Sequence, residues 1–287
     1  MKLIKSNRRQ AKIKMALQGP AGSGKTYSSL LIAKGLASGD FSKVAVIDSE
    51  NGSSNLYAEL GEFNVITLDQ YSPESYIQAI ELCEKEGMEV IIIDSITHAW
   101  EFLLDYHGSL SGNSFTNWNK VTPRQRAFID KILKSSSHII ATMRTKQDYV
   151  LNQINGKFIP EKVGLKAVQR DGVEYEFTII MNLDIKHFTT SSKDRTGMFM
   201  DKPEFQITMG VGKKIKEWCN QGIDLESMIG NIKCCTSNEE LNSLYNELEI
   251  HKDELNTHFI SQQKMIQNNE LIINLKNIEK NGISKNT

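Results

Sequence analysis

The chain has few of the features that mark secreted, membrane or metal-binding proteins. Only four of its 287 residues are cysteines, Cys83, Cys219, Cys234 and Cys235, and their spacing fits no metal-ligand pattern. We therefore expect reduced thiols rather than a disulfide framework. No hydrophobic run approaches the ~20 residues of a membrane-spanning helix. The basic N-terminal residues lack the apolar core of a signal peptide, so a cytoplasmic protein is expected.

An excess of charge of one sign is missing as well. The chain has 34 Lys and Arg residues against 35 Asp and Glu, a formal net charge of −1. This balance provides no overall attraction to nucleic acid or to a membrane surface. The length is sufficient for one large domain with an appendage.

Glycine is concentrated in one short segment, Gly19-Pro20-Ala21-Gly22-Ser23-Gly24-Lys25-Thr26. The segment fits G-x-x-x-x-G-K-[ST], the phosphate-binding loop of nucleoside-triphosphatases. Its glycines let backbone N–H groups turn toward phosphate oxygens, Lys25 can reach the β- and γ-phosphates, and the Thr26 hydroxyl can hold Mg²⁺. A strand-like segment before it and a helical one after it supply the required context. The loop therefore predicts a nucleotide site, where Tyr27 could stack near the nucleotide or simply pack.

Strand-like and helix-like segments alternate along the first half of the chain. Strands are expected at 43–48, 64–68, 90–93 and 138–143, and helices at 53–60, 73–86, 95–107 and 122–133. This order predicts an α/β fold with an open, mostly parallel sheet flanked by helices. Ligands on such sheets bind at the carboxyl ends of the strands. The polar stretch 108–122 is interpreted as a mobile loop.

The alternation of strand-like and helix-like segments ends near residue 146. The segments 148–154 and 157–163, separated by Asn155-Gly156, predict a β-hairpin insertion with a type I′ turn. Further strands of the sheet are expected at 173–185 and 204–208. From residue 212 the sequence predicts polar helices, with a capping box at 236–239. We expect a basic N-terminal arm (1–10), a nucleotide-binding core (11–211) and a small C-terminal helical region (212–287) that serves as a partner or assembly module.

Acidic residues stand at the ends of two expected strands. Asp94 follows the apolar run 90–93 and is placed to hold Mg²⁺, directly or through water; otherwise it caps the next helix. Asp48 and Glu50 end an earlier strand, where a carboxylate can orient and deprotonate an attacking water. The residues alone leave open which of these two acids has that role, or whether both belong to an ordinary turn.

Taken together, these motifs resemble the RecA-like ATPases over residues 11 to about 210. In the RecA recombinase family, the strand after the phosphate-loop helix ends in I-D-x-E, and its Glu is the catalytic base; this role carries to Glu50. The family's metal strand ends in Asp-Ser, as at Asp94-Ser95. A polar sensor at the end of the following strand falls on Thr142, where RecA has Gln.

A further element, Lys193-Asp194-Arg195-Thr196-Gly197, resembles the K-x-K or K-x-R-x-G element of RecA proteins and DnaB-type helicases. In those families the two cations enter the neighbouring subunit's site and stabilise charge on the γ-phosphate, as an arginine finger does. The resemblance therefore implies that Lys193 and Arg195 act in trans, within a homo-oligomeric ring or filament. By itself, the element also fits a solvated loop.

The layout is most similar to RecA-like nucleotide-binding proteins of bacteriophages and prophages, some of which assist single-strand annealing and recombination. This resemblance implies Mg-ATP hydrolysis by in-line water attack in the cytoplasm of a bacterial host. It implies phage recombination or replication proteins as partners. Two alternatives are a small-molecule or nucleotide kinase with the same loop, and an ATP-dependent assembly scaffold that hardly hydrolyses ATP.

The family places a DNA-contacting loop after the sensor strand. Residues 144–170 of this chain carry six cations against two acids, six minus two or +4. Single-stranded DNA is therefore an expected partner, and Tyr149 and Phe158 could supply stacking faces. Exposed lysines and aromatic residues are also ordinary on hairpins. The first fourteen residues carry six cations, Lys14 among them, and no acid, and could add phosphate contacts as a flexible arm. The predicted DNA contacts are Arg144, Lys146, Lys157, Lys166 and Arg170.

Overall fold

The computed structural model describes residues 11–154, 157–220, 225–248 and 252–283. These residues divide into two compact units: the larger ends at Cys219 and the smaller begins at Asn220. The expected basic arm, residues 1–10, lies outside the described residues.

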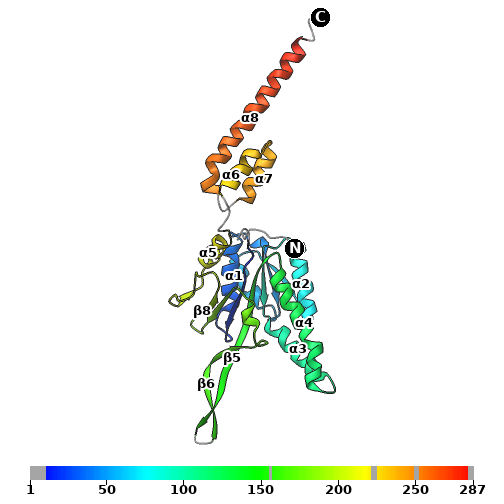
Figure 1. Cartoon of the computed structure of the whole chain (residues 1–287), viewed down its shortest axis with the longest axis vertical. Helices are drawn as coiled ribbons and strands as arrows, with labels where there is room; N and C mark the ends of the chain where they lie inside the picture. The colour runs from blue at the N-terminus through cyan, green and yellow to red at the C-terminus, as the bar shows by residue number, and fades with distance from the viewer. Residues whose placement is uncertain (1–10, 155–156, 221–224, 249–251, 284–287) are drawn as a thin grey trace, which may run out of the picture. The chain divides into compact units, whose positions relative to one another are not determined.

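A nine-stranded, mostly parallel sheet forms the centre of the larger unit (Figure 1). Its spatial order is β3-β2-β4-β5-β1-β7-β8-β9, with β6 paired to β5 alone. The six strands from β3 to β7 in this order are parallel to their neighbours, and the remaining pairs are antiparallel. The strands are β1 (Lys14–Gly19), β2 (Val44–Asp48), β3 (Asn64–Thr67), β4 (Val90–Asp94), β5 (His138–Ile154), β6 (Lys157–Ala167), β7 (Ile179–Leu183), β8 (Phe188–Asp194) and β9 (Phe205–Gln206). The predicted fold class is confirmed.

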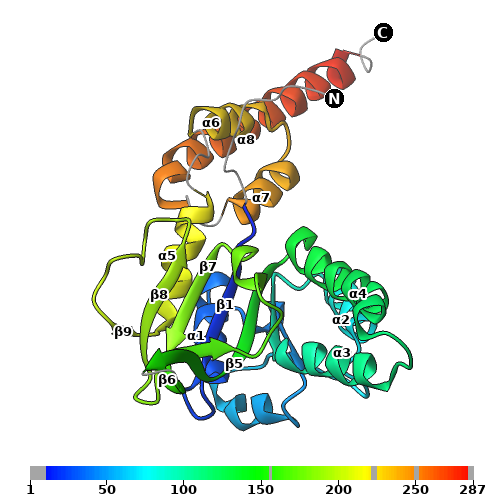
Figure 2. The same cartoon turned by 60° about the horizontal axis from the view of Figure 1, so that its bottom comes forward.

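Helices cover both faces of this sheet, because its central strands alternate buried side chains between the two faces. Met15 and Leu17 pack with α1 (Lys25–Leu36) and α5 (Met209–Asn220). Ala16 lies in the second core cluster with α2 (Pro73–Lys85), α3 (Thr97–Ser109) and α4 (Ser114–Lys134). Figure 2 shows α2, α3 and α4 grouped on one side of the sheet.

Helix α5 packs directly on α1 within the larger unit. A Cβ atom added at Gly212 would lie 2.0 Å from the Ile32 carbonyl oxygen and 2.9 Å from the Gly35 Cα. Only glycine permits this close approach of two helices. The boundary expected between 211 and 212 therefore falls inside a helix that packs on the sheet unit.

The stretch 108–122, interpreted above as a mobile loop, is mostly helical, and that interpretation is wrong. Helix α4 begins at Ser114, well before the expected residue 122. Asn113 caps it by accepting a hydrogen bond from the Phe115 N–H at 2.8 Å. The Trp118 ring also stacks on His107 of α3, with 4.3 Å between ring centroids. Capping and aromatic packing thus extend the helix through a polar sequence.

Lys14, counted among the N-terminal cations available to DNA phosphates, belongs to the core instead. Its Nζ donates to the carbonyl oxygens of Ser135, at 2.8 Å, and Ser137. Burial, with a smaller contribution from Lys12, lowers its pKa to about 8. Lys14 therefore ties β1 to the turn before β5 and is not a phosphate contact.

Strands β5 and β6 extend beyond the sheet as a two-stranded antiparallel ribbon (Figure 1). Their register runs from Thr145 opposite Ala167 to Ile154 opposite Lys157, which agrees with the predicted hairpin. The turn residues Asn155 and Gly156 lie outside the described residues. The side chains of residues 148–163 also lie outside them, including the predicted contact Lys157 and the aromatic residues Tyr149 and Phe158.

The smaller unit contains α6 (Leu225–Cys234), α7 (Asn238–Glu247) and α8 (Lys252–Ile283). Its core is apolar: Met228, Ile232, Leu241, Leu248, Leu255, Phe259 and Ile266. The capping box falls one residue later than expected: Ser237 accepts from the Glu240 N–H, and Glu240 accepts from the Thr236 N–H. Within the described part of the chain, every helix is too short or too polar to span a membrane.

Candidate nucleotide site

The loop that joins β1 to α1 has the backbone geometry of an anion-binding site. Gly22 and Gly24 have φ angles of 79° and 82°, in the left-handed region that favours glycine. Helix α1 begins at Lys25 without a side-chain cap and without an acidic residue in its first turn. Its first N–H groups and the positive end of its dipole are therefore available to an anion.

The side chain of Lys25 lies over this loop. Its Nζ donates to the carbonyl oxygens of Gly19 and Pro20, both at 2.9 Å. Burial lowers the pKa of Lys25, whereas the nearby carboxylates of Asp94 and Glu50 oppose that shift. The ammonium group is thus held by two carbonyl oxygens that it can exchange for phosphate oxygens.

Three oxygen-bearing side chains meet beside the phosphate loop: Thr26 in the first turn of α1, Asp94 at the end of β4, and Thr142 of β5, which pairs with Leu17 of β1. The Thr26 Oγ1 donates to Asp94 Oδ2 at 2.6 Å, and the Thr142 Oγ1 donates to Asp94 Oδ1. Asp94 is only 1% exposed, and burial raises its pKa, with smaller contributions in the same direction from the charges of Glu50 and Asp48. Thr142, assigned above as a sensor by resemblance, therefore contacts the acid assigned to the metal.

These residues fit a bound Mg²⁺ ion. Mg²⁺ prefers hard oxygen ligands and keeps several waters, so a hydroxyl and a carboxylate suffice as protein contacts. A cation beside Asp94 would also favour the charged carboxylate, which burial disfavours. The Ser23 Oγ in the loop is buried and has no hydrogen-bond partner among the described residues, which leaves it free for a phosphate oxygen.

The two acids after β2 have different structural positions. Asp48 is buried, and its carboxylate accepts the backbone N–H groups of Glu50 at 2.7 Å, Gly52 at 3.2 Å and Ser54 at 3.0 Å. Asp48 therefore builds the turn that follows the strand. Glu50 extends from that turn, and its charge acts on both Lys25 and Asp94.

Glu50 forms a two-pronged ion pair with Arg144. The Arg144 Nε donates to Glu50 Oε1 at 2.9 Å, and the second guanidinium nitrogen donates to Oε2. Burial by itself would raise the pKa of Glu50, but the hydrogen bonds and charge of Arg144 outweigh it, so the pKa is lowered. His98 Nε2 lies 4.0 Å from Glu50 Oε1, and its Nδ1 lies 2.8 Å from the Ser49 Oγ.

The pairing of Arg144 with Glu50 was missed at the sequence level, where Arg144 was assigned to DNA. Arg144 aligns with Gly19 in the parallel register of β5 and β1, so it stands at the carboxyl edge of the sheet beside the phosphate loop. The sequence signal that could have revealed this pairing was the position of Arg144, two residues after Thr142, because the carboxyl ends of parallel strands lie at one edge of the sheet.

Lys193 and Arg195 hold carbonyl oxygens of the short helix η3 (Val173–Tyr175) in this single chain. The Lys193 Nζ donates to the carbonyl oxygens of Glu174, at 3.0 Å, and Tyr175, and Arg195 donates to Tyr175 O at 3.1 Å. Burial and the neighbouring Arg195 lower the pKa of Lys193. Their action in a neighbouring subunit stays a prediction.

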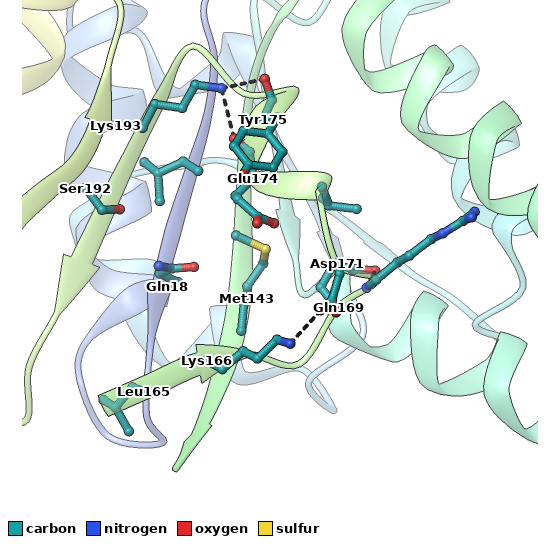
Figure 3. Close-up of a pocket in the computed structure, with 14 residues that line it drawn as sticks. Gln18, Met143, Leu165, Lys166, Gln169, Asp171, Glu174, Tyr175, Ser192 and Lys193 are labelled. Carbon is teal, nitrogen blue, oxygen red and sulfur yellow. Dashed lines mark hydrogen bonds and ion pairs between the residues drawn. The ribbon is translucent and has the colours of Figure 1, made fainter. Parts of the chain in front are cut away.

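The strand that carries Lys193 shares a cavity with the root of the β5–β6 hairpin (Figure 3). The cavity has a volume of about 500 Å³. Gln18, one residue before the phosphate loop, lines one wall, and the ion pair between Lys166 Nζ and Asp171 Oδ1, at 2.7 Å, lies on another. Phosphate loop, hairpin root and Lys193 are therefore adjacent in the fold.

Near Arg170, a group of aromatic side chains lines a second cavity of about 600 Å³. Trp100 and Trp118 stack with 6.1 Å between ring centroids, and Phe115 is 89% exposed. Of the other predicted DNA contacts, Lys146 is exposed on β5, whereas Lys166 is held by Asp171.

The sheet and the loop between β1 and α1 have the fold of the phosphate-loop nucleoside-triphosphatases. The chain belongs to the AAA domain family, whose model matches residues 11–226. This membership implies nucleotide binding, usually with Mg²⁺. A search of curated proteins finds no match to the chain.

Proposed function

We propose that the chain is an oligomeric, RecA-like Mg-ATPase that binds single-stranded DNA in phage-type recombination or replication. The observation that supports hydrolysis best is the convergence of four side chains from three strand ends: Lys25, Thr26, Asp94 and Glu50. Residues 212–287 would then serve as the partner or assembly module.

In the proposed reaction, Lys25 and the loop N–H groups bind the phosphates of ATP. Mg²⁺, held by Thr26 and Asp94, would neutralise charge on the β- and γ-phosphates. A carboxylate oxygen of Glu50 orients a water in line with the bond that breaks and takes its proton, while the water oxygen attacks the γ-phosphorus. The bridging oxygen leaves with ADP, and Arg144 keeps Glu50 ionised beforehand.

The structure offers little support for the kinase alternative. A phosphate-loop kinase needs arginines that close over its two substrates. Between Asp94 and His138, Arg124 is bound by Glu74 at 2.7 Å and lies over the Tyr106 ring, 4.8 Å from its centroid. The scaffold alternative requires no base, yet Glu50 is placed and ionised beside the loop.

Steady-state ATP hydrolysis with and without single-stranded DNA, across protein concentration, tests the proposal. We expect stimulation by DNA and a rate per subunit that rises with concentration, because the site is completed by a neighbour. Phe115→Ala should weaken DNA binding by about fivefold or more, because Phe115 is 89% exposed at the cavity that Arg170 lines and one base stacked on an aromatic ring contributes about 1–3 kcal/mol. Leu82→Ala, an exposed apolar position on α2, is the control. A rate indifferent to DNA and to concentration would count against both the DNA role and the Lys193 and Arg195 fingers.

Arg144→Gln is expected to move the acid limb of the pH–rate profile upward. Arg144 lowers the pKa of Glu50, so Glu50 stays deprotonated, and able to accept a proton, to lower pH. Without Arg144, burial raises that pKa, and turnover is lost at a higher pH as the solution is acidified. Profiles of kcat from pH 5 to 9 for both proteins provide the measurement. Superimposable profiles would show that Arg144 does not control the charge of the base.

A further inference from the structure

A third cavity lies directly beside the phosphate loop. It has a volume of about 420 Å³, within the range of small-molecule sites. Two loop glycines, Gly22 and Gly24, form one side. The remaining lining residues come from four separate segments: Tyr27 and Ser28, Tyr57, His187, and Gln206 with Ile207. A nucleotide anchored by its phosphates in the loop must place its sugar and base close by, and this cavity offers that space.

The aromatic wall of the cavity consists of Tyr27, in the first turn of α1, and Tyr57, in the 3₁₀ helix η2 (Ser53–Leu60). Their ring centroids are 5.5 Å apart, and Tyr27 is 40% exposed. Asp48, which forms the turn that presents Glu50, also accepts the Ser54 hydroxyl and N–H and so holds the start of η2. One buried carboxylate thus positions both Glu50 and the segment that carries Tyr57.

The polar wall is formed by His187 and Gln206. Asp184 fixes the turn between β7 and β8 by accepting the N–H groups of Lys186 at 2.9 Å and Phe188 at 2.8 Å. This turn holds His187 at a φ of 67°, with its Nδ1 3.0 Å from the position that a Cβ on Gly24 would take. Gln206 lies on β9, opposite Phe188, and its side chain is exposed.

We propose that this cavity binds the nucleobase and that Gln206, together with His187, selects adenine. This inference rests on the proposed function, because it assigns the base-recognition part of the same nucleotide site. The face of the base stacks on the tyrosine wall. The Gln206 side-chain amide both donates and accepts, which matches the adjacent acceptor and amino group on the edge of adenine. Guanine presents two adjacent acceptors on that edge and matches the amide poorly.

Calorimetric binding of Mg-ATP, Mg-GTP and inorganic tripolyphosphate to the full chain separates base recognition from phosphate binding. Gln206→Ala is expected to reduce the preference for ATP over GTP by about tenfold, the size of one bidentate base contact. Tyr27→Ala is expected to weaken both nucleotides by about fivefold. Neither change should affect tripolyphosphate, which has no base. Ile185→Ala is the control: it lies 70% exposed in the His187 turn and does not line the cavity.

The possible outcomes distinguish a failure of the proposed base site from a failure of the proposed ATPase. Unchanged ATP affinity and selectivity in both variants would overturn the base site alone. An equal loss of tripolyphosphate affinity would also overturn it, since the residues would then act on the phosphate loop. If the wild-type chain bound neither nucleotides nor tripolyphosphate, both proposals would fail. Selective ATP binding without hydrolysis would contradict the ATPase and leave the base site standing.

Discussion

Glu50→Gln is expected to lower ATP turnover by about 10²–10⁴-fold, the usual contribution of a general base. The substitution keeps the size of the side chain but removes its ability to accept a proton. Lys25 and the loop N–H groups do not depend on Glu50 for position, so ATP binding should persist. Single-turnover hydrolysis and equilibrium ATP binding, measured on the same preparation, separate chemistry from affinity.

Two further variants sharpen the Glu50 experiment. Glu62→Gln, at an exposed position shortly after η2, should leave turnover unchanged. Asp48→Asn weakens the turn that presents Glu50, so it should also reduce turnover, but with lower stability in urea, because Asp48 is buried and accepts several hydrogen bonds. Normal turnover in Glu50→Gln would remove Glu50 from the role of base and favour a scaffold or kinase.

The double variant Lys193→Ala/Arg195→Ala is expected to lose about 10³-fold or more of turnover, as other finger deletions do. In one chain these cations rest on carbonyl oxygens of Glu174 and Tyr175. Each such contact contributes about 1–3 kcal/mol at most. Lys193 and Arg195 can therefore give up these contacts for a contact with the charged γ-phosphate of a neighbouring subunit at a small cost in free energy. Lys202→Ala, which removes an exposed lysine nearby in sequence, should have no effect.

Mixing experiments test whether these two cations act in trans. The double variant retains Glu50, and Glu50→Gln retains both cations, so neither should turn over ATP by itself. In a mixed oligomer, the cations of a Glu50→Gln subunit can complete the site of a double-variant neighbour, and activity should reappear. A mixture no more active than its components would show that Lys193 and Arg195 do not act between subunits.

The local motifs were accessible without a fold because their chemistry depends on neighbours in the chain. The phosphate loop is a contiguous turn whose glycines at 22 and 24 need positive φ, and spacing alone reveals it. Strand β4 reads as a continuous apolar run because it is buried on both faces. The hairpin follows from an Asn-Gly pair between two β-prone segments, and the paired strands agree with it.

Contacts between distant segments required the folded chain. Arg144 and Glu50 are 94 residues apart, and nothing local distinguishes that arginine from a DNA contact. From the residues alone, Asp48 and Glu50 were equivalent candidates for the base, and only the resemblance to RecA favoured Glu50. In the structure, backbone N–H groups occupy the carboxylate of Asp48. Lys14 appeared to be one more exposed cation, and the stretch leading to Trp118 appeared to be a loop. The tertiary structure contradicted these predictions, because the burial of a side chain and its bonding partners depend on which strand ends and helices meet in space.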